Sequence, residues 1–177
     1  MLKGKNIKLR ALEPTDVDIL YHWENDDKIW HLSNTVTPFS KFDLEQYVIS
    51  SQQDIFTTKQ LRLMIDKIDK GNQKVTIGSI DLFDFDPANK RAGIGILIVK
   101  EERRKGYAAE ALELLLEYCF KILHLHQVYC NITINNTASL NLFKKHNFKI
   151  IGKKNEWLHI KDKWMDEYVL QLIHYQA

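Results

Sequence analysis

The chain has 177 residues, of which 45% are hydrophobic and 27% charged, so it can form one full core and is too apolar for a disordered or collagen-like protein. Its 25 basic and 23 acidic residues give a net charge of +2, which excludes the strongly basic surface that binds nucleic acid non-specifically. Three prolines and the lack of a repeat or a Gly/Ser-rich linker indicate a single domain over residues 1–177.

The first part of the chain predicts two helices and a run of antiparallel strands. Pro14 marks the start of a helix that runs through Trp23, and Ser40 with Asp43 has the capping-box spacing of a second helix start. Alternating apolar residues predict four strands, at 6–11, 62–67, 75–83 and 92–99. Turn signals join the last three of these strands into an antiparallel meander, at 71–72 and 86–89.

A charged segment, residues 100–106, separates this meander from a long amphipathic helix. Apolar residues at helical spacing form a stripe that we expect to face the core: Leu112, Leu115, Leu116, Cys119 and Leu123. The remaining patterns predict a strand, a helix, the start of a further strand and a closing strand, at 128–134, 137–146, 148–152 and 164–173. Strands followed by alternating helices and strands indicate an α+β or mixed α/β fold.

The strand expected at 92–99 is followed by a cationic loop that leads directly into the long helix. Backbone N–H groups at a helix start have no partner within the helix and lie at the positive end of its dipole, so they favour phosphate groups. Gly106 would let a ligand approach the backbone, and Ala108 and Ala109 keep the first turn open. The alternative is a solvated run of charges before an ordinary helix. The spacing fits neither a P-loop nor the GxGxxG dinucleotide fingerprint.

Two segments carry a family resemblance. Residues 103–108, Arg-Arg-Lys-Gly-Tyr-Ala, match the acetyl-CoA loop Q/R-x-x-G-x-G/A of the GNAT (Gcn5-related N-acetyltransferase) superfamily. Residues 135–148 match its second signature, N-x-x-S-x-x-L-Y-x-K-x-G-F. The opening, at 9–16 and 23–26, resembles the branch of ribosomal-protein N-terminal and spermidine acetyltransferases. The resemblance covers nearly the whole chain.

This resemblance implies a central mixed, mostly antiparallel sheet with helices on both faces and a splayed gap between the fourth and fifth strands, here 92–99 and 128–134. A bulge at 93–95 would help these strands to part, because glycine within a strand often marks one. Acetyl-CoA is the implied co-substrate, with its pantetheine arm on the fourth strand and its pyrophosphate on the loop. The residues implied to bind it are Ile96, Leu97, Ile98, Val99, Arg103, Arg104, Lys105, Gly106, Tyr107, Ala108, Ala109, Asn136, Ser139 and Phe143. For Asn136 and Ser139, helix capping is the alternative.

The implied reaction is attack by a neutral amine on the thioester, which calls for a base and for an acid that protonates the leaving thiolate. Here the chain departs from the family. Phe143 stands where the family often has a tyrosine acid, and the glutamate of spermidine-acetylating relatives maps near Gly93. We consider Asp81 and His31 as the candidate catalytic residues. A solvent-facing position is the alternative for Asp81, and a structural role is the alternative for His31. Asp84 resembles a strand-end residue.

The acceptor is less well defined than the co-substrate. Aromatic residues that can surround a cationic amine cluster near the N-terminus, although core packing would also explain them: Tyr21, Trp23, Trp30 and Phe39. The segment 31–38 contains no carboxylate, which weakens a polyamine acceptor. We therefore expect an N-acetyltransferase for a peptide amine, such as a protein N-terminus, or a small-molecule amine such as a polyamine, amino sugar or antibiotic. The alternative is a catalytically impaired CoA-binding regulatory or structural protein of the same fold.

The remaining expectations concern partners and location. A homodimer or higher homo-oligomer would use the closing strand and residues 157–164. The seven histidines show no metal-ligand spacing, so no metal is expected. Cys119 and Cys130 are too few for a disulfide framework and are expected to be buried thiols. No apolar run is long enough to span a membrane and residues 1–5 lack a signal-peptide pattern, so we expect no membrane partner and a cytoplasmic location.

Overall fold

The computed structural model describes residues 2–26, 37–68, 75–160 and 162–175. The strands are β1 Leu2–Lys3, β2 Ile7–Ala11, β3 Leu61–Lys67, β4 Val75–Asp86, β5 Arg91–Ile98, β6 Gln127–Thr133, β7 Lys149–Ile160 and β8 Lys163–Ile173. The α-helices are α1 Val17–Glu24, α3 Lys41–Ser50, α4 Ile55–Thr58, α5 Tyr107–Glu117 and α6 Thr137–Lys145. Short helical turns of other types are η1 Pro14–Asp16, η2 Lys100–Glu102 and η3 Tyr118–Ile122.

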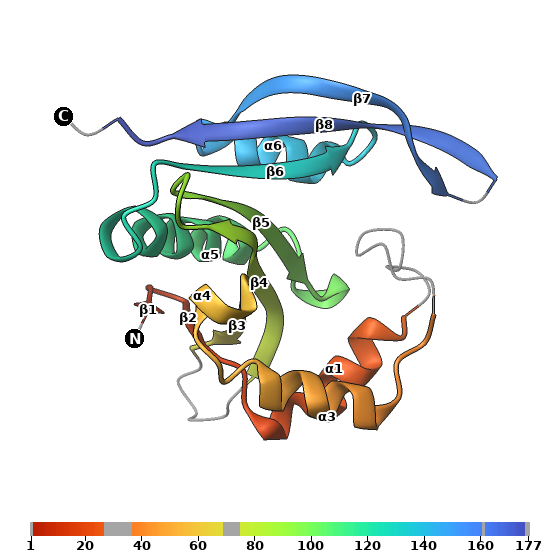
Figure 1. The fold of residues 1–177 in the computed structure, drawn as a ribbon. Helices are drawn as coiled ribbons and strands as arrows, with labels where there is room; N and C mark the ends of the chain where they lie inside the picture. The colour runs from red at the N-terminus through yellow and green to blue at the C-terminus, as the bar shows by residue number, and fades with distance from the viewer. Residues whose placement is uncertain (1, 27–36, 69–74, 161, 176–177) are drawn as a thin grey trace.

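The strands form one mixed sheet in the order β1-β2-β3-β4-β5-β6-β8-β7. Only β5 and β6 pair in parallel among the described strands, and their ladder has three rungs, the last between Gly93 and Tyr129. Beyond that rung β5 continues to Ile98 and β6 to Thr133 without pairing to each other. Figure 1 shows the two strands diverging from this point. The splayed gap expected between them is therefore confirmed, and we call its closed end, at Gly93 and Tyr129, the vertex.

Helices cover both faces of the sheet, as the resemblance implied, and each face has its own core (Figure 1). On the α5 face, Leu112, Leu115 and Cys119 are completely buried against the sheet, and the rest of the expected stripe is partly buried. On the opposite face, which we call the α1–α3 face, Leu20 and Val48 pack on Met64 of β3. Burying each such side chain contributes about 1.5–3 kcal/mol. Cys119 and Cys130 are free, buried thiols, as expected.

A buried charge cluster explains the sequence of the opening segment. Arg10 of β2 donates two hydrogen bonds to Asp16 of η1, at 2.7 and 2.8 Å, and its Nε donates to Asp66 of β3 at 2.8 Å. Thr76 of β4 donates to the other oxygen of Asp66. Buried carboxylates need such partners, because an isolated buried charge is costly. The cluster thereby fixes the start of α1 relative to the sheet.

The expected helix starts agree with the structure. Ser40 and Asp43 form the capping box at the start of α3, each side chain accepting a hydrogen bond from the other residue's backbone N–H. The long helix begins at Tyr107, but its last turn, η3, is π-helical rather than α-helical. β1 and α4 were not predicted, because two strand residues and one helical turn are too short to show a periodicity.

The expected bulge at 93–95 is wrong, because β5 is regular there and the irregularity lies on its neighbour β4. The register shifts between Phe83 and Asp86, and Asp84 has a φ of 49° within this bulge. Asp84 is therefore not at the end of its strand, since β4 continues to Asp86. The expected turn at 71–72 lies outside the described residues.

Candidate active site

The free edge of β5 forms one wall of the gap. Val99 donates its N–H to Ile77 O at 2.9 Å, so its backbone faces β4. Because successive residues of a strand direct their backbone groups to opposite sides, Ile96 and Ile98 offer theirs to the gap. The Ile98 carbonyl accepts a hydrogen bond from Arg103 Nε at 2.8 Å. Of the four strand residues expected to hold a pantetheine arm, these two have backbone groups aimed at it, and Leu97 and Val99 direct theirs to β4.

The start of α5 lies at the open end of the gap. Gly106 is the N-cap residue with a φ of 87°, and within the described residues it has no side-chain cap. The first helical hydrogen bond runs from Glu110 N to Gly106 O, so Tyr107, Ala108 and Ala109 present N–H groups that the helix does not use. A Cβ at Gly106 would meet no atom within 4 Å. This open space beside free N–H groups fits a pyrophosphate.

The cationic side chains of the loop differ in what they contact. Lys105 pairs with Glu102 at 2.9 Å, and Lys67 of β3 pairs with the same carboxylate at 3.2 Å. The hydrogen bonds from Lys105 and from Lys67 lower the pKa of Glu102. Arg103 reaches back to β5, whereas Arg104 is exposed with a φ of 63°. Arg104 is thus placed to meet an anion from solvent.

The second signature forms the start of α6. Asn136 is the N-cap residue, and its Oδ1 accepts a hydrogen bond from Ser139 N at 3.2 Å. The capping alternative therefore holds for this pair, and a contact of either with CoA stays a prediction. Phe143 is only 2% exposed and packs edge-to-face on Phe148, with ring centroids 4.9 Å apart. Its ring has no proton to give to a leaving group.

A charged row crosses the α1–α3 face beside the gap. Asp81 of β4 accepts two hydrogen bonds from Arg62 of β3, at 2.8 and 3.1 Å, and Arg62 donates a third to Glu24 of α1 at 2.6 Å. The guanidinium also lies over the Tyr47 ring, 5.4 Å from its centroid. Burial works against the charge of Arg62, but its carboxylate neighbours outweigh that and raise its pKa. Asp81 is 26% exposed and neighbours Gly95 of β5, so its side chain is an ion-pair partner at the edge of the gap.

A second row lies at the vertex, where Phe83, Gly93 and Tyr129 occupy neighbouring positions on β4, β5 and β6. The rings of Phe83 and Tyr129 meet edge-to-face over Gly93, with centroids 5.8 Å apart. A Cβ at Gly93 would overlap the Phe83 ring, so no side chain fits there. Tyr129 donates its hydroxyl to Asp84 Oδ2 at 3.1 Å. Burial and this carboxylate raise the pKa of Tyr129 to about 12.

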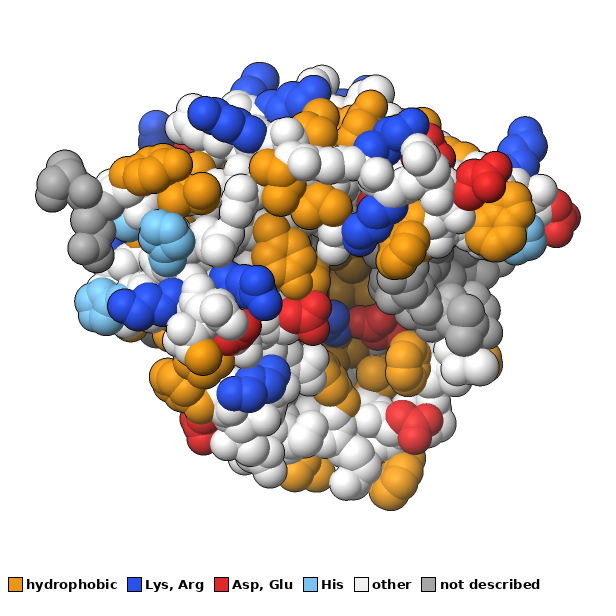
Figure 2. All heavy atoms as spheres, turned by 45° about the horizontal axis from the view of Figure 1, so that its top comes forward, with side chains coloured by type: hydrophobic (Ala, Val, Ile, Leu, Met, Phe, Trp, Pro, Cys, Tyr) orange, Lys and Arg blue, Asp and Glu red, His pale blue; other side chains and the backbone are white. Residues whose placement is uncertain are grey.

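Figure 2 shows that the surface is hollowed near its middle, with acidic and basic side chains beside hydrophobic ones at the bottom of the hollow. Sequence reasoning found Asp81, set Asp84 aside as a strand-end residue, and missed Glu24, Arg62 and Tyr129. No local pattern marks these three residues, because they come from separate elements and each is defined by a partner distant in sequence. His31, the other catalytic candidate, lies outside the described residues.

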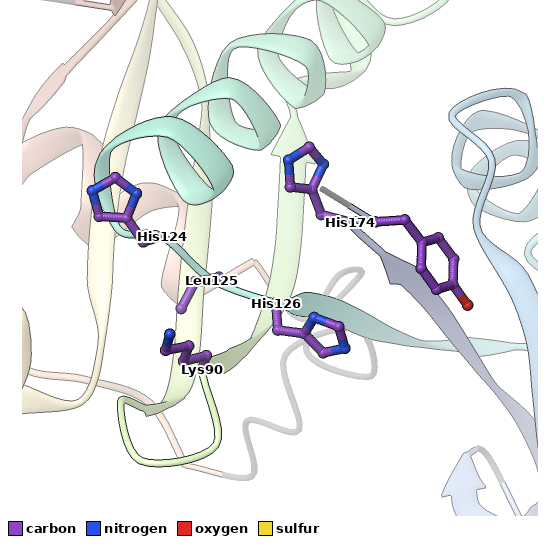
Figure 3. Close-up of a pocket in the computed structure, with 6 residues that line it drawn as sticks. Lys90, His124, Leu125, His126 and His174 are labelled. Atoms are coloured by element: carbon purple, nitrogen blue, oxygen red, sulfur yellow. The ribbon is translucent and has the colours of Figure 1, made fainter. Parts of the chain in front are cut away.

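One cavity lies away from the gap, and a second lies beside the start of α5, next to Gly106. The first, of about 360 Å³, is lined by Lys90, His124, Leu125, His126, His174 and Tyr175 (Figure 3). The other, of about 470 Å³, lies beside the first turns of α5 and carries three glutamates, Glu110, Glu113 and Glu117.

Within the described residues, no group of three or more His, Cys, Asp or Glu side chains is placed to hold a metal ion. In the same residues, no helix combines the length and apolarity needed to cross a membrane.

Comparison with known proteins agrees with this geometry. The acetyltransferase (GNAT) domain family matches residues 6–149. Spermidine N(1)-acetyltransferase of Vibrio cholerae is 27% identical over 175 residues, which cover 95% of each chain. Probable N-acetyltransferase YjcK of Bacillus subtilis is 27% identical over 184 residues, covering 98% of this chain and 97% of that protein.

The crystal structure of the Vibrio cholerae spermidine N-acetyltransferase in complex with CoA and spermine has the same fold. Its TM-score is 0.84 at 24% sequence identity, and the match covers 94% of this chain and 95% of that one. The resemblance inferred from the two signatures and the opening segment is thus confirmed. Since the family match spans most of its length, the chain belongs to the GNAT family of N-acetyltransferases.

Proposed function

We propose that this enzyme transfers the acetyl group of acetyl-CoA to the primary amine of a small cationic acceptor, with polyamines as the first class to test. The observation that carries the proposal is the gap between β5 and β6, which opens onto the uncapped start of α5. A thioester arm fits along the backbone of Ile96 and Ile98, and its phosphates fit at Gly106. The family membership and the similar spermidine acetyltransferase support the same reaction.

The charge of the α1–α3 face supports a cationic acceptor. Three carboxylates, of Glu24, Asp81 and Asp84, border this side of the gap, and they outnumber the two nearby guanidinium groups of the described residues, Arg62 and Arg91. An excess of negative charge in a hollow attracts a cation and raises its local concentration. A second amine on the acceptor would therefore help it to bind, which favours a polyamine over an amino sugar that has a single amine.

The reacting amine must first lose a proton. A lysine-like amine has a pKa near 10.4, so freeing its lone pair at neutral pH costs roughly 4 kcal/mol, at about 1.36 kcal/mol per unit. Carboxylates near the gap would bind the ammonium form, and water between them would accept its proton. The acetyl group then moves directly from sulfur to nitrogen in a ternary complex.

The test is acetyl transfer to a pooled panel of amines, detected by mass spectrometry. The panel contains spermidine, amino sugars, aminoglycosides and short peptides with free α-amines, and a parallel calorimetric titration measures CoA binding. A product heavier by one acetyl group identifies the acceptor class, and we expect it from spermidine. A product from peptides alone would contradict the polyamine assignment, and the absence of both product and CoA binding would contradict the whole proposal.

One observation favours a second function, that of a CoA-binding protein without turnover. Phe143 stands where the family often has a tyrosine acid, and the glutamate of spermidine-acetylating relatives maps near Gly93. CoA binding without any product from the panel would support this alternative.

We further propose that the β7–β8 hairpin forms a homo-oligomer contact. Trp157 and Trp164 are about three-fifths exposed there, at 59% and 61%, and Ile151 is 57% exposed. Exposed apolar groups of this size are typical of interaction surfaces. Light scattering after size exclusion measures the mass directly, and a Trp164→Lys variant should shift it toward the monomer. The expected cytoplasmic location stays a prediction.

A further inference from the structure

The two functional groups that this chain lacks at the family positions occur together elsewhere at the vertex. A hydroxyl is missing at Phe143 and a carboxylate is missing at Gly93. Tyr129 and Asp84 supply one of each, joined by a hydrogen bond of 3.1 Å across β5. This pair lies on the α1–α3 face, the side on which the proposed acceptor binds.

We propose that Tyr129 is the catalytic proton donor to the leaving CoA thiolate and that Asp84 is a positioning residue for its hydroxyl. This inference rests on the proposed function, because it assigns the proton transfer within the same acetyl-transfer site.

The position of Tyr129 is set by the backbone. It is the last residue of β6 that pairs with β5, so its ring stands where the gap closes. Its neighbour across the ladder is Gly93, and because this residue has no side chain, the Phe83 ring occupies the space above it. Phe83 supports the ring from the other side in an edge-to-face contact at an angle of 84°. The hydroxyl reaches across β5 to Asp84 of β4, so it is held at the closed end of the gap, on the face where the proposed acceptor binds.

The β4 bulge determines where the Asp84 side chain points. Its φ of 49° is a left-handed conformation that a regular strand would not have. The bulge turns its carboxylate across β5 toward Tyr129 on β6, although Asp84 itself is exposed. A conformation of this kind persists only where the surroundings determine it, and such positions cluster at functional sites.

The environment keeps the donor protonated. Burial and the negative charge of Asp84 raise the pKa of Tyr129, and Arg91 of β5 is the nearby positive charge that acts in the opposite direction. Arg91 is itself paired with Asp86 at 3.2 Å. Tyr129 therefore carries its proton throughout the neutral range, as an acid must before the step.

The step balances without any further reagent. The lone pair of the amine forms the N–C bond at the acetyl carbon, and the C–S bond breaks with its electron pair leaving on sulfur. The Tyr129 proton moves to sulfur, which gives the free thiol of CoA. The phenolate then takes a proton from the acetylated nitrogen, which gives the neutral amide and restores the hydroxyl.

The main test is Tyr129→Phe, which removes the hydroxyl and keeps the ring and its contact with Phe83. We expect kcat to fall by about 100-fold or more, the range that general acid catalysis supplies, with CoA affinity unchanged. Tyr118→Phe is the matched control, since Tyr118 is also a half-buried tyrosine with a raised pKa but lies in η3, on the α5 face. It should retain the parent kcat.

Asp84→Asn tests the positioning role. Asparagine also adopts left-handed backbone conformations, so the bulge is kept while the charge is lost. We expect kcat to fall by about tenfold, and the double variant to be no slower than Tyr129→Phe alone, because both changes act on one group. An ultraviolet titration of the free protein gives a readout without turnover. The Tyr129 phenol should ionise at lower pH in Asp84→Asn than in the parent.

The outcomes separate the two proposals. A kcat of Tyr129→Phe within about threefold of the parent overturns this inference and leaves the proposed function intact. A parent enzyme that acetylates no amine in the panel overturns both. An unchanged phenol titration in Asp84→Asn overturns the positioning role alone.

Discussion

The two sides of the gap differ in the kind of chemical group that they offer to a ligand. On the CoA side, the groups available to a ligand are backbone N–H and C=O groups of β5 and of the start of α5, with Gly106 giving access to them. On the α1–α3 side they are side chains from α1, β3, β4 and β6 that contact one another. A backbone site requires particular residues at fixed spacing, whereas a side-chain site can be assembled from many combinations of distant positions.

The largest expected effect concerns the vertex, where the two sides meet. Gly93→Ala places a Cβ in the Phe83 ring, and overpacking of this kind costs about 1–3 kcal/mol of unfolding free energy. Gly95→Ala is the matched control, because its Cβ would lie 4.0 Å from the same ring, an ordinary contact. Urea denaturation measures the unfolding free energy of both variants. Equal stability of the two variants would show that the vertex is not tightly packed.

The next largest effect is expected in the charged row of the α1–α3 side. It tests whether ion pairs stabilise that side. Arg62→Met leaves Asp81 and Glu24 without their shared guanidinium, and we expect a loss of about 2 kcal/mol, less than for a fully buried pair because the groups are about one-fifth exposed. Lys41→Met, which breaks the exposed pair with Asp18, should leave the midpoint of denaturation unchanged. An equal loss of unfolding free energy in both variants would mean that burial does not determine how much each ion pair stabilises the protein.

The CoA side should respond through affinity instead. Gly106→Ala adds a Cβ at a φ of 87°, which strains the backbone, and the Cβ points into the space assigned to the pyrophosphate. We expect the Kd for CoA to rise about tenfold, or 1.4 kcal/mol. The control is Gly152→Ala, since Gly152 also has open space around it but lacks the positive φ. A Kd that Gly106→Ala leaves unchanged would remove Gly106 from the CoA site.

The smallest effect is a pH dependence of stability at the vertex. The pKa of Tyr129 is raised from 10.0 to about 12, so the folded state binds this proton more tightly than the unfolded state. The resulting stabilisation is complete below pH 10 and is lost as the pH rises from about 10 to 12. Denaturation at pH 9 and 11 should show this loss in the parent and a smaller loss in Tyr129→Phe.

The difference between a backbone site and a side-chain site also explains which parts of the structure the sequence could predict. The loop around Gly106 and the start of α6 at Asn136 were found because capping and phosphate binding restrict the residues that work there. The splay followed from family resemblance, but its accompanying bulge was placed on β5 instead of β4. The sequence around Asp84 gives no sign of the bulge, and the hydrogen-bond partner of its carboxylate, Tyr129, lies 45 residues away. Arg62 likewise lies in an ordinary strand pattern.

The overlap between a Cβ at position 93 and the Phe83 ring also limits which variants of this enzyme are accessible. While the phenylalanine is present, a carboxylate side chain at position 93 collides with the ring, so introducing it alone is expected to destabilise the protein. Shortening Phe83 first would remove the ring that supports Tyr129 and would leave an unfilled space at the vertex. Each single change is therefore expected to lower the stability of the protein, and the two neighbouring positions are expected to act non-additively. Paired libraries at 83 and 93 are the direct route to a carboxylate at position 93.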